Sequence, residues 1–392
     1  MHPIVIIGSG MAGYTVAREF RKLNTEQELV MICADDAINY AKPTLSNALT
    51  GKKEPEQIAL GDAEKMGTQL NMRIEKNTWV QAIDTHTQTL TLKNSQGQST
   101  QQYSKLILSI GATPVRLAIA GTGSEDIHVV NHLDDYKAFR KQLAKQQDKR
   151  VVILGAGLIG CEFANDLQNT DHQVTVIDLA KQPLGRLLPS HVADKFKQNL
   201  TEAGINFVLN TTVEKISKTD NKDYVVHLSN GQTLMADIVL SAIGLQPNIN
   251  VAKTAGINTS RGIVTNSLLE TNVSYIYAVG DCAEVNGTLL PYVMPIMQQA
   301  RALAKTLNNN TTHVHYPAMP VAVKTPSSPL TVLPAPSNVD VTWQTEELED
   351  GMIAKALDST NTLRGFVLLG STAGKQRLTL TKQVPDLIPL HN

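Results

Sequence analysis

Two segments of the chain repeat one pattern, in which a short apolar run leads directly into glycines spaced as Gly-x-Gly-x-x-Gly. The copies occupy residues 4–13 and 151–160, and each is followed by an amphipathic stretch and a second apolar run. Such glycines allow a tight turn after a strand and let the backbone at a helix N-terminus approach a pyrophosphate. A single copy is a weak signal, but two copies in this context predict an α/β chain with two dinucleotide-binding units.

Helical patterns surround these two units. Apolar residues at helical spacing predict a helix over residues 134–149. Another helix is expected from an N-cap at Ser190 to a stop at Gly204. Pro295, which is well tolerated in a first helical turn, is expected to open a third helix that ends at Leu307.

Strand patterns account for much of the remaining chain. Turn residues within 85–103 and 224–235 predict an antiparallel hairpin inserted into each dinucleotide unit. After Met319 the chain is rich in Thr, Val and Pro and has no third glycine fingerprint. This last region is therefore expected to form a small α+β domain.

Composition and charge narrow the class of protein. The length of 392 residues exceeds the usual size of one hydrophobic core, and the net charge of -1 gives no general attraction to nucleic acid or anionic lipid. The longest apolar candidate, Leu289–Met297, is too short to cross a bilayer and contains two prolines, and no basic leader precedes the first strand. The three cysteines, Cys33, Cys161 and Cys282, form no CxxC pair. We therefore expect a cytoplasmic protein.

Acidic residues near the ends of the second strands suggest how each dinucleotide is recognised. Asp178 lies where a carboxylate binds an adenosine ribose 2′-hydroxyl and repels a 2′-phosphate. The nearest following arginine is Arg186, so the second unit is expected to prefer NADH to NADPH. In the first unit Ala34 occupies the usual acidic position and Asp35 follows it, which leaves ribose contact by Asp35 as one reading.

Three further strand ends carry glycine motifs. Gly280 and Asp281 follow an apolar run in a pattern similar to the second FAD signature of flavoproteins that bind two dinucleotides. An ordinary strand-end turn is the alternative explanation, because Gly-Asp is common there. The segments Gly111–Pro114 and Gly244–Pro247 are similar to the strands by which such chains cross between domains.

Taken in order, these motifs resemble the pyridine-nucleotide:disulfide oxidoreductase superfamily over residues 1 to about 310. Within that superfamily, Lys42–Ser46, Gly160–Phe163 and Val323–Pro326 are similar to the rubredoxin-NAD(+) reductases. The resemblance implies two Rossmann-like domains arranged as in glutathione reductase, followed by a small C-terminal α+β domain. The resemblance implies an FAD-binding domain in two parts, residues 1–115 and 246–318. It implies an NADH-binding domain over residues 116–245 and the C-terminal domain over residues 319–392.

The resemblance also implies which residues bind the cofactors. Lys42 and Glu162 are expected beside the flavin ring as catalytic residues, although an isolated lysine is more often a solvated surface charge. Val80 and Val293 are expected to give backbone contacts, Lys324 to approach the pyrimidine edge of the flavin, and the helix after Pro295 to face its N1–O2 edge. The full set expected to bind non-covalent FAD or NADH is Gly8, Ser9, Gly10, Met11, Ala12, Gly13, Cys33, Ala34, Asp35, Lys42, Val80, Gly111, Gly155, Gly157, Gly160, Glu162, Asp178, Gly244, Gly280, Asp281, Val293 and Lys324.

The cysteines favour one activity within the superfamily. Disulfide reductases of this kind need paired cysteines beside the flavin, and relatives that reduce peroxide or oxygen use one cysteine near the segment that here contains Ser46. The three cysteines of this chain are best explained as small packing residues. We therefore expect hydride transfer from NADH to flavin N5, followed by single-electron release to rubredoxin, a small acidic iron protein. Lys42, Lys52 and Lys53 are candidates for its electrostatic footprint.

Several alternatives remain open from sequence. The acceptor could be the ferredoxin of an oxygenase system, or the chain could be a non-catalytic flavoprotein that senses NADH. An NADH oxidase is disfavoured by the absence of a cysteine near Ser46. We expect no metal site, because alternation in a strand explains His313 and His315. The short C-terminal domain slightly favours a monomer over a dimer.

Overall fold

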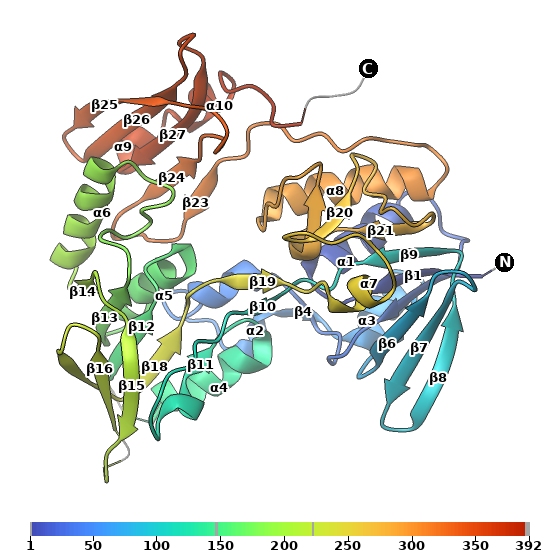
Figure 1. Cartoon of the computed structure of the whole chain (residues 1–392), viewed down its shortest axis with the longest axis horizontal. Helices are drawn as coiled ribbons and strands as arrows, with labels where there is room; N and C mark the ends of the chain where they lie inside the picture. The colour runs from blue at the N-terminus through green and yellow to red at the C-terminus, as the bar shows by residue number, and fades with distance from the viewer. Residues whose placement is uncertain (1, 146–147, 222, 389–392) are drawn as a thin grey trace.

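The computed structural model describes residues 2–145, 148–221 and 223–388. Its N-terminal part is built on a parallel five-stranded sheet, which is covered on one face by α1 (Met11–Arg21) and α8 (Val293–Leu307) (Figure 1). The strands in spatial order are β21 (Ile276–Ala278), β9 (Lys105–Leu108), β1 (Ile4–Ile7), β2 (Leu29–Ile32) and β5 (Arg73–Glu75). The central strand β1 is wholly buried, as its apolar sequence requires in a sheet covered on both faces.

A meander and several short elements complete this part. The meander packs Ile83, Leu90 and Leu92 into the same core as the sheet, and consists of β6 (Trp79–Asp84), β7 (Thr89–Asn94) and β8 (Gly97–Gln102). The short elements are β3 (Asn39–Tyr40), η1 (Lys42–Ser46), α2 (Pro55–Ile58), β4 (Ala59–Gly61), α3 (Ala63–Gln69), α7 (Asn250–Thr254), β20 (Ile263–Thr265), η3 (Gly280–Cys282) and β22 (Ala283–Val285). The hairpin expected within residues 85–103 is confirmed.

A second parallel sheet forms the middle of the chain. Its strands in spatial order are β11 (His128–Val129), β18 (Ile238–Ser241), β12 (Arg150–Leu154), β13 (Gln173–Asp178) and β14 (Asn206–Leu209). Its helices are α4 (Leu133–Leu143), α5 (Leu158–Gln168) and α6 (Ser190–Glu202), with the 3-10 turn η2 (Ser124–Asp126). A second meander, β15 (Val213–Lys218), β16 (Tyr224–Leu228) and β17 (Thr233–Ala236), packs against the sheet. The two parallel sheets confirm the predicted fold class.

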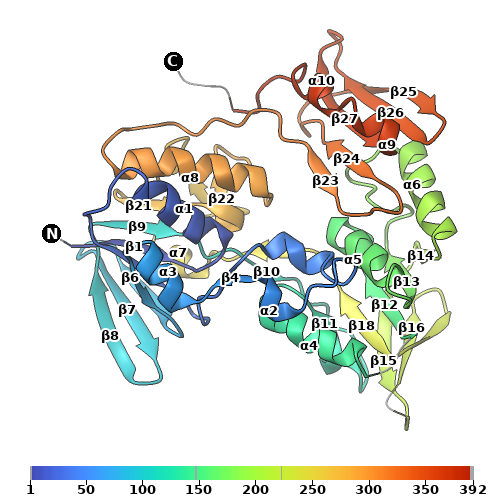
Figure 2. The same cartoon turned by 180° about the vertical axis from the view of Figure 1, so that it is seen from behind.

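Two extended segments connect these parts. β10 (Ala112–Pro114) and β19 (Leu245–Pro247) run antiparallel and pair with each other, so the chain crosses between the sheets twice at one place (Figure 1), and Figure 2 shows β10 there from behind. They are the two glycine-to-proline segments that the sequence indicated as crossings. The domain limits at residues 115, 245 and 318 stay predictions.

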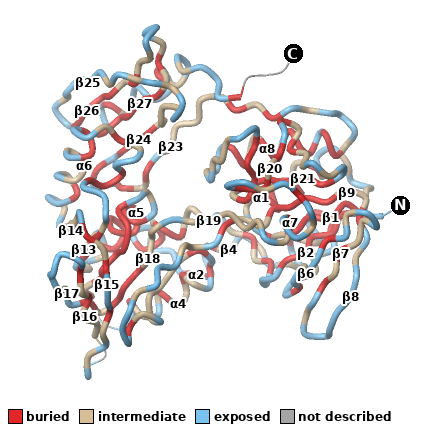
Figure 3. The backbone as a smooth tube through the Cα atoms, in the orientation of Figure 1, coloured by how far each residue is buried: buried red, intermediate tan, exposed pale blue. Residues whose placement is uncertain are grey.

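The C-terminal part is an antiparallel sheet packed on the middle part of the chain. Its strands in spatial order are β23 (Val321–Val323), β24 (Leu330–Leu333), β27 (Leu363–Leu369), β26 (Gly351–Leu357) and β25 (Thr342–Leu348), with the short helices α9 (Ser371–Gly374) and α10 (Arg377–Thr381). Val332, Ala354 and Val367 share a hydrophobic core with Phe196 of α6. Figure 3 shows this burial as red segments running through the inner strands.

Helix boundaries differ from the sequence predictions in three places. Pro189, not Ser190, is the N-cap of α6, although Gly204 follows its end at φ +100° as expected. α4 ends at Leu143 instead of residue 149, and residues 146–147 of the predicted helix lie outside the described residues. α8 begins at Val293, so Pro295 is its third residue. Proline fits there because an N–H in the first turn has no acceptor within the helix.

Two further findings concern predicted absences. His313 and His315 do not lie in a strand, so alternation in a strand was the wrong explanation. His315 lies 2.8 Å from Asp386 and His313 is 2.6 Å from Ser267. Within the described ranges, no helix is both long and apolar enough to cross a membrane.

Candidate active site

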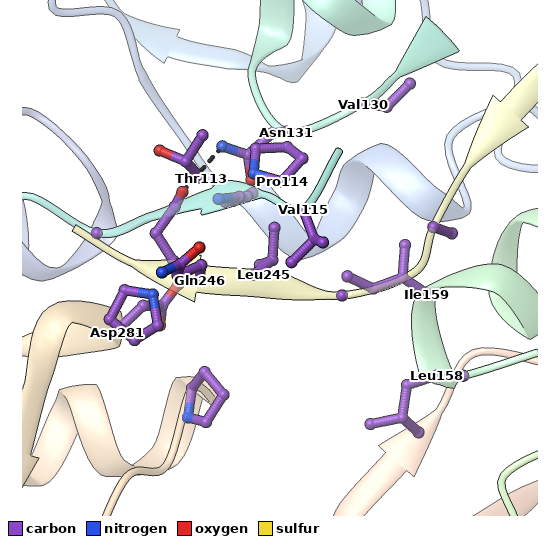
Figure 4. A pocket seen from close by; sticks show the side chains of 18 of the residues that line it. Thr113, Pro114, Val115, Val130, Asn131, Leu158, Ile159, Leu245, Gln246 and Asp281 are labelled. Atoms are coloured by element: carbon purple, nitrogen blue, oxygen red, sulfur yellow. Dashed lines mark hydrogen bonds between the residues drawn. The ribbon is translucent and has the colours of Figure 1, made fainter. Parts of the chain in front are cut away.

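A cavity of about 2510 Å³ is lined by residues of all three parts of the molecule. Residues of β10 and β19 line it together with the start of α5, as Figure 4 shows for Thr113, Gln246 and Leu158. Every residue of the predicted binding set lines this cavity except Gly13, Gly160 and Gly280. The fold therefore gathers residues that are more than 300 positions apart in sequence, such as Ser9 and Lys324, around one space.

The three exceptions are packing positions behind the cavity. A Cβ at Gly13 would lie 2.1 Å from the carbonyl oxygen of Gly8, and a Cβ at Gly160 would lie 1.9 Å from that of Gly155. Gly280, at φ +78°, would bring a Cβ within 2.7 Å of Ala12. Gly13 and Gly280 let backbone pack against the first glycine loop, and Gly160 does so at the second, as the last glycine of the fingerprint does in general.

The middle glycines have the opposite environment. A Cβ at Gly10 or Gly157 would meet no atom within 4 Å, and both residues line the cavity. They are the N-caps of α1 and α5, and neither cap makes a side-chain hydrogen bond. Each helix thus presents free backbone N–H groups and the positive end of its dipole to an open space, which fits a pyrophosphate in both loops.

Each glycine loop has a carboxylate hydrogen-bonded to it. Asp35 accepts a hydrogen bond of 2.6 Å from the hydroxyl of Ser9. Asp178 accepts one of 2.6 Å from the backbone N–H of Ala156 and one of 2.7 Å from that of Ala180. Both acids lie at the rim of the cavity beside a loop suited to a pyrophosphate, where a ribose hydroxyl would be within reach.

A buried carboxylate connects three parts of the molecule. Glu162 of α5 is only 6% exposed and accepts a hydrogen bond of 2.6 Å from the hydroxyl of Ser46 in η1. It also accepts a bond of 3.0 Å from the backbone N–H of Lys324 and forms an ion pair with the Lys324 ammonium. Since the charge is paired and both oxygens are bonded, these contacts offset the cost of burying the carboxylate.

Lys42 and Asp281 form a second charged couple on the cavity wall. Burial lowers the pKa of Lys42, and the nearby Asp281 carboxylate acts against that shift. Burial raises the pKa of Asp281, and Lys42 acts against it. Each group therefore favours the charged form of the other beside the cavity. Lys42 and Glu162, both expected beside the flavin ring, each have a separate charged partner, since Lys324 pairs with Glu162.

The cysteines have the properties of packing residues. All three are free and buried, and burial raises the pKa of Cys33 and of Cys282 to about 12. Burial also raises the pKa of Cys161. Thiols that resist ionisation are poor nucleophiles, so no described cysteine is suited to thiol–disulfide chemistry.

Sequence reasoning missed several residues of the cavity wall. They include Leu158, Ile159 and Gln246, which lie between the glycines or prolines of motifs, and Trp79 and Asn131, which lie outside any motif. Ile159 and Gln246 sit within or next to motifs already identified, so the motif neighbourhood was a usable signal for them. Trp79 and Asn131 reach the cavity only through tertiary folding, and no local pattern marks them.

Comparison with known proteins agrees with this architecture. A family model described as pyridine nucleotide-disulphide oxidoreductase matches residues 2–306, and one described as the rubredoxin binding C-terminal domain matches residues 313–384. The chain belongs to the pyridine nucleotide-disulphide oxidoreductase family.

Individual relatives resemble it over their whole lengths. The chain is 76% identical to the rubredoxin-NAD(+) reductase of Acinetobacter baylyi over 390 residues, which covers 99% of both chains. It is 40% identical to the rubredoxin-NAD(+) reductase of Alcanivorax borkumensis, covering 99% of this chain and 100% of the relative. Among solved structures, the putidaredoxin reductase–putidaredoxin complex matches with a TM-score of 0.88 and 25% identity, over 98% of this chain and 94% of that one.

Proposed function

We propose that this chain is a rubredoxin-NAD(+) reductase, which uses FAD to pass electrons from NADH to rubredoxin. The observation that carries the proposal is that one cavity is lined by both glycine loops, so the two cofactors would meet there. No described cysteine is suited to relay the electrons. The 76% identity to a rubredoxin-NAD(+) reductase and the match of residues 313–384 to a rubredoxin binding domain support rubredoxin as acceptor.

The first glycine loop is the proposed FAD site. Ser9 to Ala12 and the N-terminus of α1 would hold its pyrophosphate, Asp35 its adenosine ribose, and Asp281 its ribityl chain. Lys42 and Val80 would contact FAD from the same part of the molecule. When bound, FAD supplies a ring that accepts hydride and releases electrons singly.

The second glycine loop is the proposed NADH site. Gly155 and Gly157 with the N-terminus of α5 would hold the pyrophosphate, and Asp178 the ribose hydroxyl. Ile159, which is 39% exposed at the cavity, gives an apolar surface for the nicotinamide end. These residues would bind NADH and orient it toward the FAD site, and they would take no part in the hydride transfer themselves.

Charged groups around the cavity would stabilise the negative charge that develops on the flavin when it is reduced. The N-terminus of α8, which begins at the cavity residue Val293, directs its positive dipole end into the space. Lys324 adds a cation that Glu162 holds in place. We assign Lys42 and Glu162 the role of fixing the charge pattern beside the flavin ring, with no proton transfer of their own. The free, buried cysteines suit the reducing cytoplasm, where we place this activity.

The test is a comparison of acceptors. The purified holoenzyme, given NADH, is expected to reduce rubredoxin at least ten times faster than a [2Fe-2S] ferredoxin at equal concentration. Faster turnover with ferredoxin would make the chain a ferredoxin reductase instead. Failure of NADH to reduce the flavin anaerobically would favour the sensor alternative over both.

A further inference from the structure

The turn at Gly280 is held from behind by one side chain of α8. The backbone N–H of Gly280 is buried and donates to the Oε1 atom of Gln299 at 2.6 Å. Gln299 lies in the middle of α8 and is only 2% exposed. A buried backbone N–H needs an acceptor, and here a side chain supplies it instead of a neighbouring strand. The position of the turn therefore depends on the position of one amide group.

The same amide group is fixed on its other side. Its Nε2 atom donates to the hydroxyl oxygen of Tyr316 at 2.6 Å, and Tyr316 is 1% exposed. Because Oε1 faces an N–H donor and Nε2 faces an oxygen, one orientation of the amide satisfies both contacts. Burial raises the pKa of Tyr316 to about 12, so its hydroxyl stays neutral at ordinary pH. Gln299 is thus bonded at both ends inside the core.

Tyr316 is anchored in turn by the end of the described chain. Its backbone N–H donates to the carbonyl of Ile388 at 2.9 Å, and its own carbonyl accepts the N–H groups of Leu387 and Ile388 at 2.8 and 3.1 Å. Tyr316 and Ile388 both belong to the hydrophobic core of the N-terminal part. These bonds hold the Tyr316 backbone on two sides, so its ring gives Gln299 a fixed partner.

The turn that Gln299 holds lies between two parts of the proposed FAD site. Gly280 has a φ of +78°, and a Cβ there would come within 2.7 Å of Ala12 in the first glycine loop. Asp281, the next residue, lines the cavity, as does Ala12. A shift of the turn would therefore disturb the loop proposed for the pyrophosphate and the carboxylate proposed for the ribityl chain together.

We propose that Gln299, fixed by Tyr316, is a positioning residue that holds the Gly280–Asp281 turn in the conformation that binds FAD. The inference rests on the proposed FAD site. Gln299 does not line the cavity, so it acts through the turn and not by contact with the cofactor. Without this acceptor the buried N–H would be unpaired, and the turn would gain a partner for it only by leaving the position that suits FAD.

The experiment compares how tightly native and variant holoenzymes hold FAD. Recovery of FAD fluorescence on dilution gives the Kd, and visible circular dichroism reports the environment of the bound flavin. Gln299→Met removes the acceptor at nearly constant volume, so it is expected to raise the Kd about 10-fold and to change the dichroism. Gln298→Met is the matched control, because that side chain makes no hydrogen bond to any described residue, and it should change neither.

Two further variants separate hydrogen bonding from packing. Gln299→Glu keeps an acceptor for the Gly280 N–H, and burial favours its neutral carboxyl, which still donates to Tyr316. Its Kd should therefore stay within about 2-fold of the native value. Tyr316→Phe removes only the bond that fixes the amide, and is expected to raise the Kd about 5-fold.

The outcomes that would overturn the inference are specific. Equal weakening of FAD binding by Gln299→Met and Gln299→Glu would mean that Gln299 only fills space, and no weakening by Gln299→Met would mean that the bond has no role. If Gln299→Met did not fold, Tyr316→Phe would decide, and a native Kd and dichroism in that variant would overturn the inference. A native protein that binds no FAD would instead disprove the proposed function.

Discussion

At the scale of single residues, the two glycine loops separate folding from binding. Gly13 and Gly160 are required by packing, since a Cβ at either would overlap a backbone oxygen. Gly10 and Gly157 are free of any such contact and face the cavity. Each three-glycine motif therefore contains one glycine that the fold requires and one that ligand binding requires.

Alanine substitutions in the second loop should separate these roles. Gly157→Ala is expected to leave the melting temperature within a few degrees of the native value and to raise KM for NADH at least 10-fold, because its methyl group would occupy the pyrophosphate space. Gly160→Ala should fold poorly, as its Cβ would lie 1.9 Å from the Gly155 oxygen. Thermal unfolding and steady-state kinetics measure the two effects. Equal loss of stability in both variants would refute this division.

At the scale of elements, helix α5 connects the three parts of the chain. Glu162 binds Ser46 and Lys324, Asp166 accepts backbone N–H groups of Leu49 and Thr50, and Asn165 exchanges hydrogen bonds with Ser327. Residues four apart on a helix share a face, which lets one helix bind segments from both sides of the cavity. The helix therefore sets the position of η1 and β23 relative to the second glycine loop.

Loss of one of these bonds should be measurable as stability. Ser46→Ala removes a hydroxyl that donates to the buried Glu162 carboxylate, so it should lower the free energy of unfolding by about 2 kcal/mol. Ser124→Ala is the matched control, because that hydroxyl bonds a carbonyl at an exposed position. Urea unfolding of the two variants gives the comparison. If both variants lost the same free energy of unfolding, the buried Ser46–Glu162 hydrogen bond would contribute no more than an exposed one.

The second sheet contains an ion pair whose effect depends on pH. The Arg150 guanidinium donates to both carboxylate oxygens of Asp237, and these hydrogen bonds lower the pKa of Asp237 below its ordinary value. The pair thus contributes stability above about pH 4, the ordinary pKa in the unfolded chain, and loses it as the pH falls through the lower pKa of the folded state.

Substitution of Asp237 tests this dependence. Asp237→Asn should lower stability at pH 7 by about 2 kcal/mol and flatten the fall in stability at acid pH. Asp340→Asn, at an exposed position, serves as the control. The measurement is urea unfolding from pH 7 down to pH 3. If the free energy of unfolding fell equally with pH in the native and variant proteins, the Arg150–Asp237 pair would not be the cause of that fall.

At the scale of the whole molecule, the sequence predicted the strands of the parallel sheets well and the contacts between the parts of the chain poorly. Apolar runs such as Ile4–Ile7 became central strands with the expected ends, because period and burial agree there. The Glu162–Lys324 pair was not foreseen, since it depends on how the C-terminal sheet packs on α6. The hydrogen bond from the Leu184 N–H to the Ala156 carbonyl was missed for a similar reason, because it joins two loops that no sequence pattern pairs.

The central claim is that electrons pass from NADH through FAD to rubredoxin without a cysteine relay. The most direct test is anaerobic stopped-flow mixing of enzyme, reduced with one NADH per bound flavin, against excess oxidised rubredoxin. The account predicts that flavin reoxidation and rubredoxin reduction proceed at the same rate and that two rubredoxins are reduced per flavin. A flavin that stays reduced in the presence of rubredoxin, or one that needs a second NADH for full reduction because a disulfide takes the first pair of electrons, would contradict it.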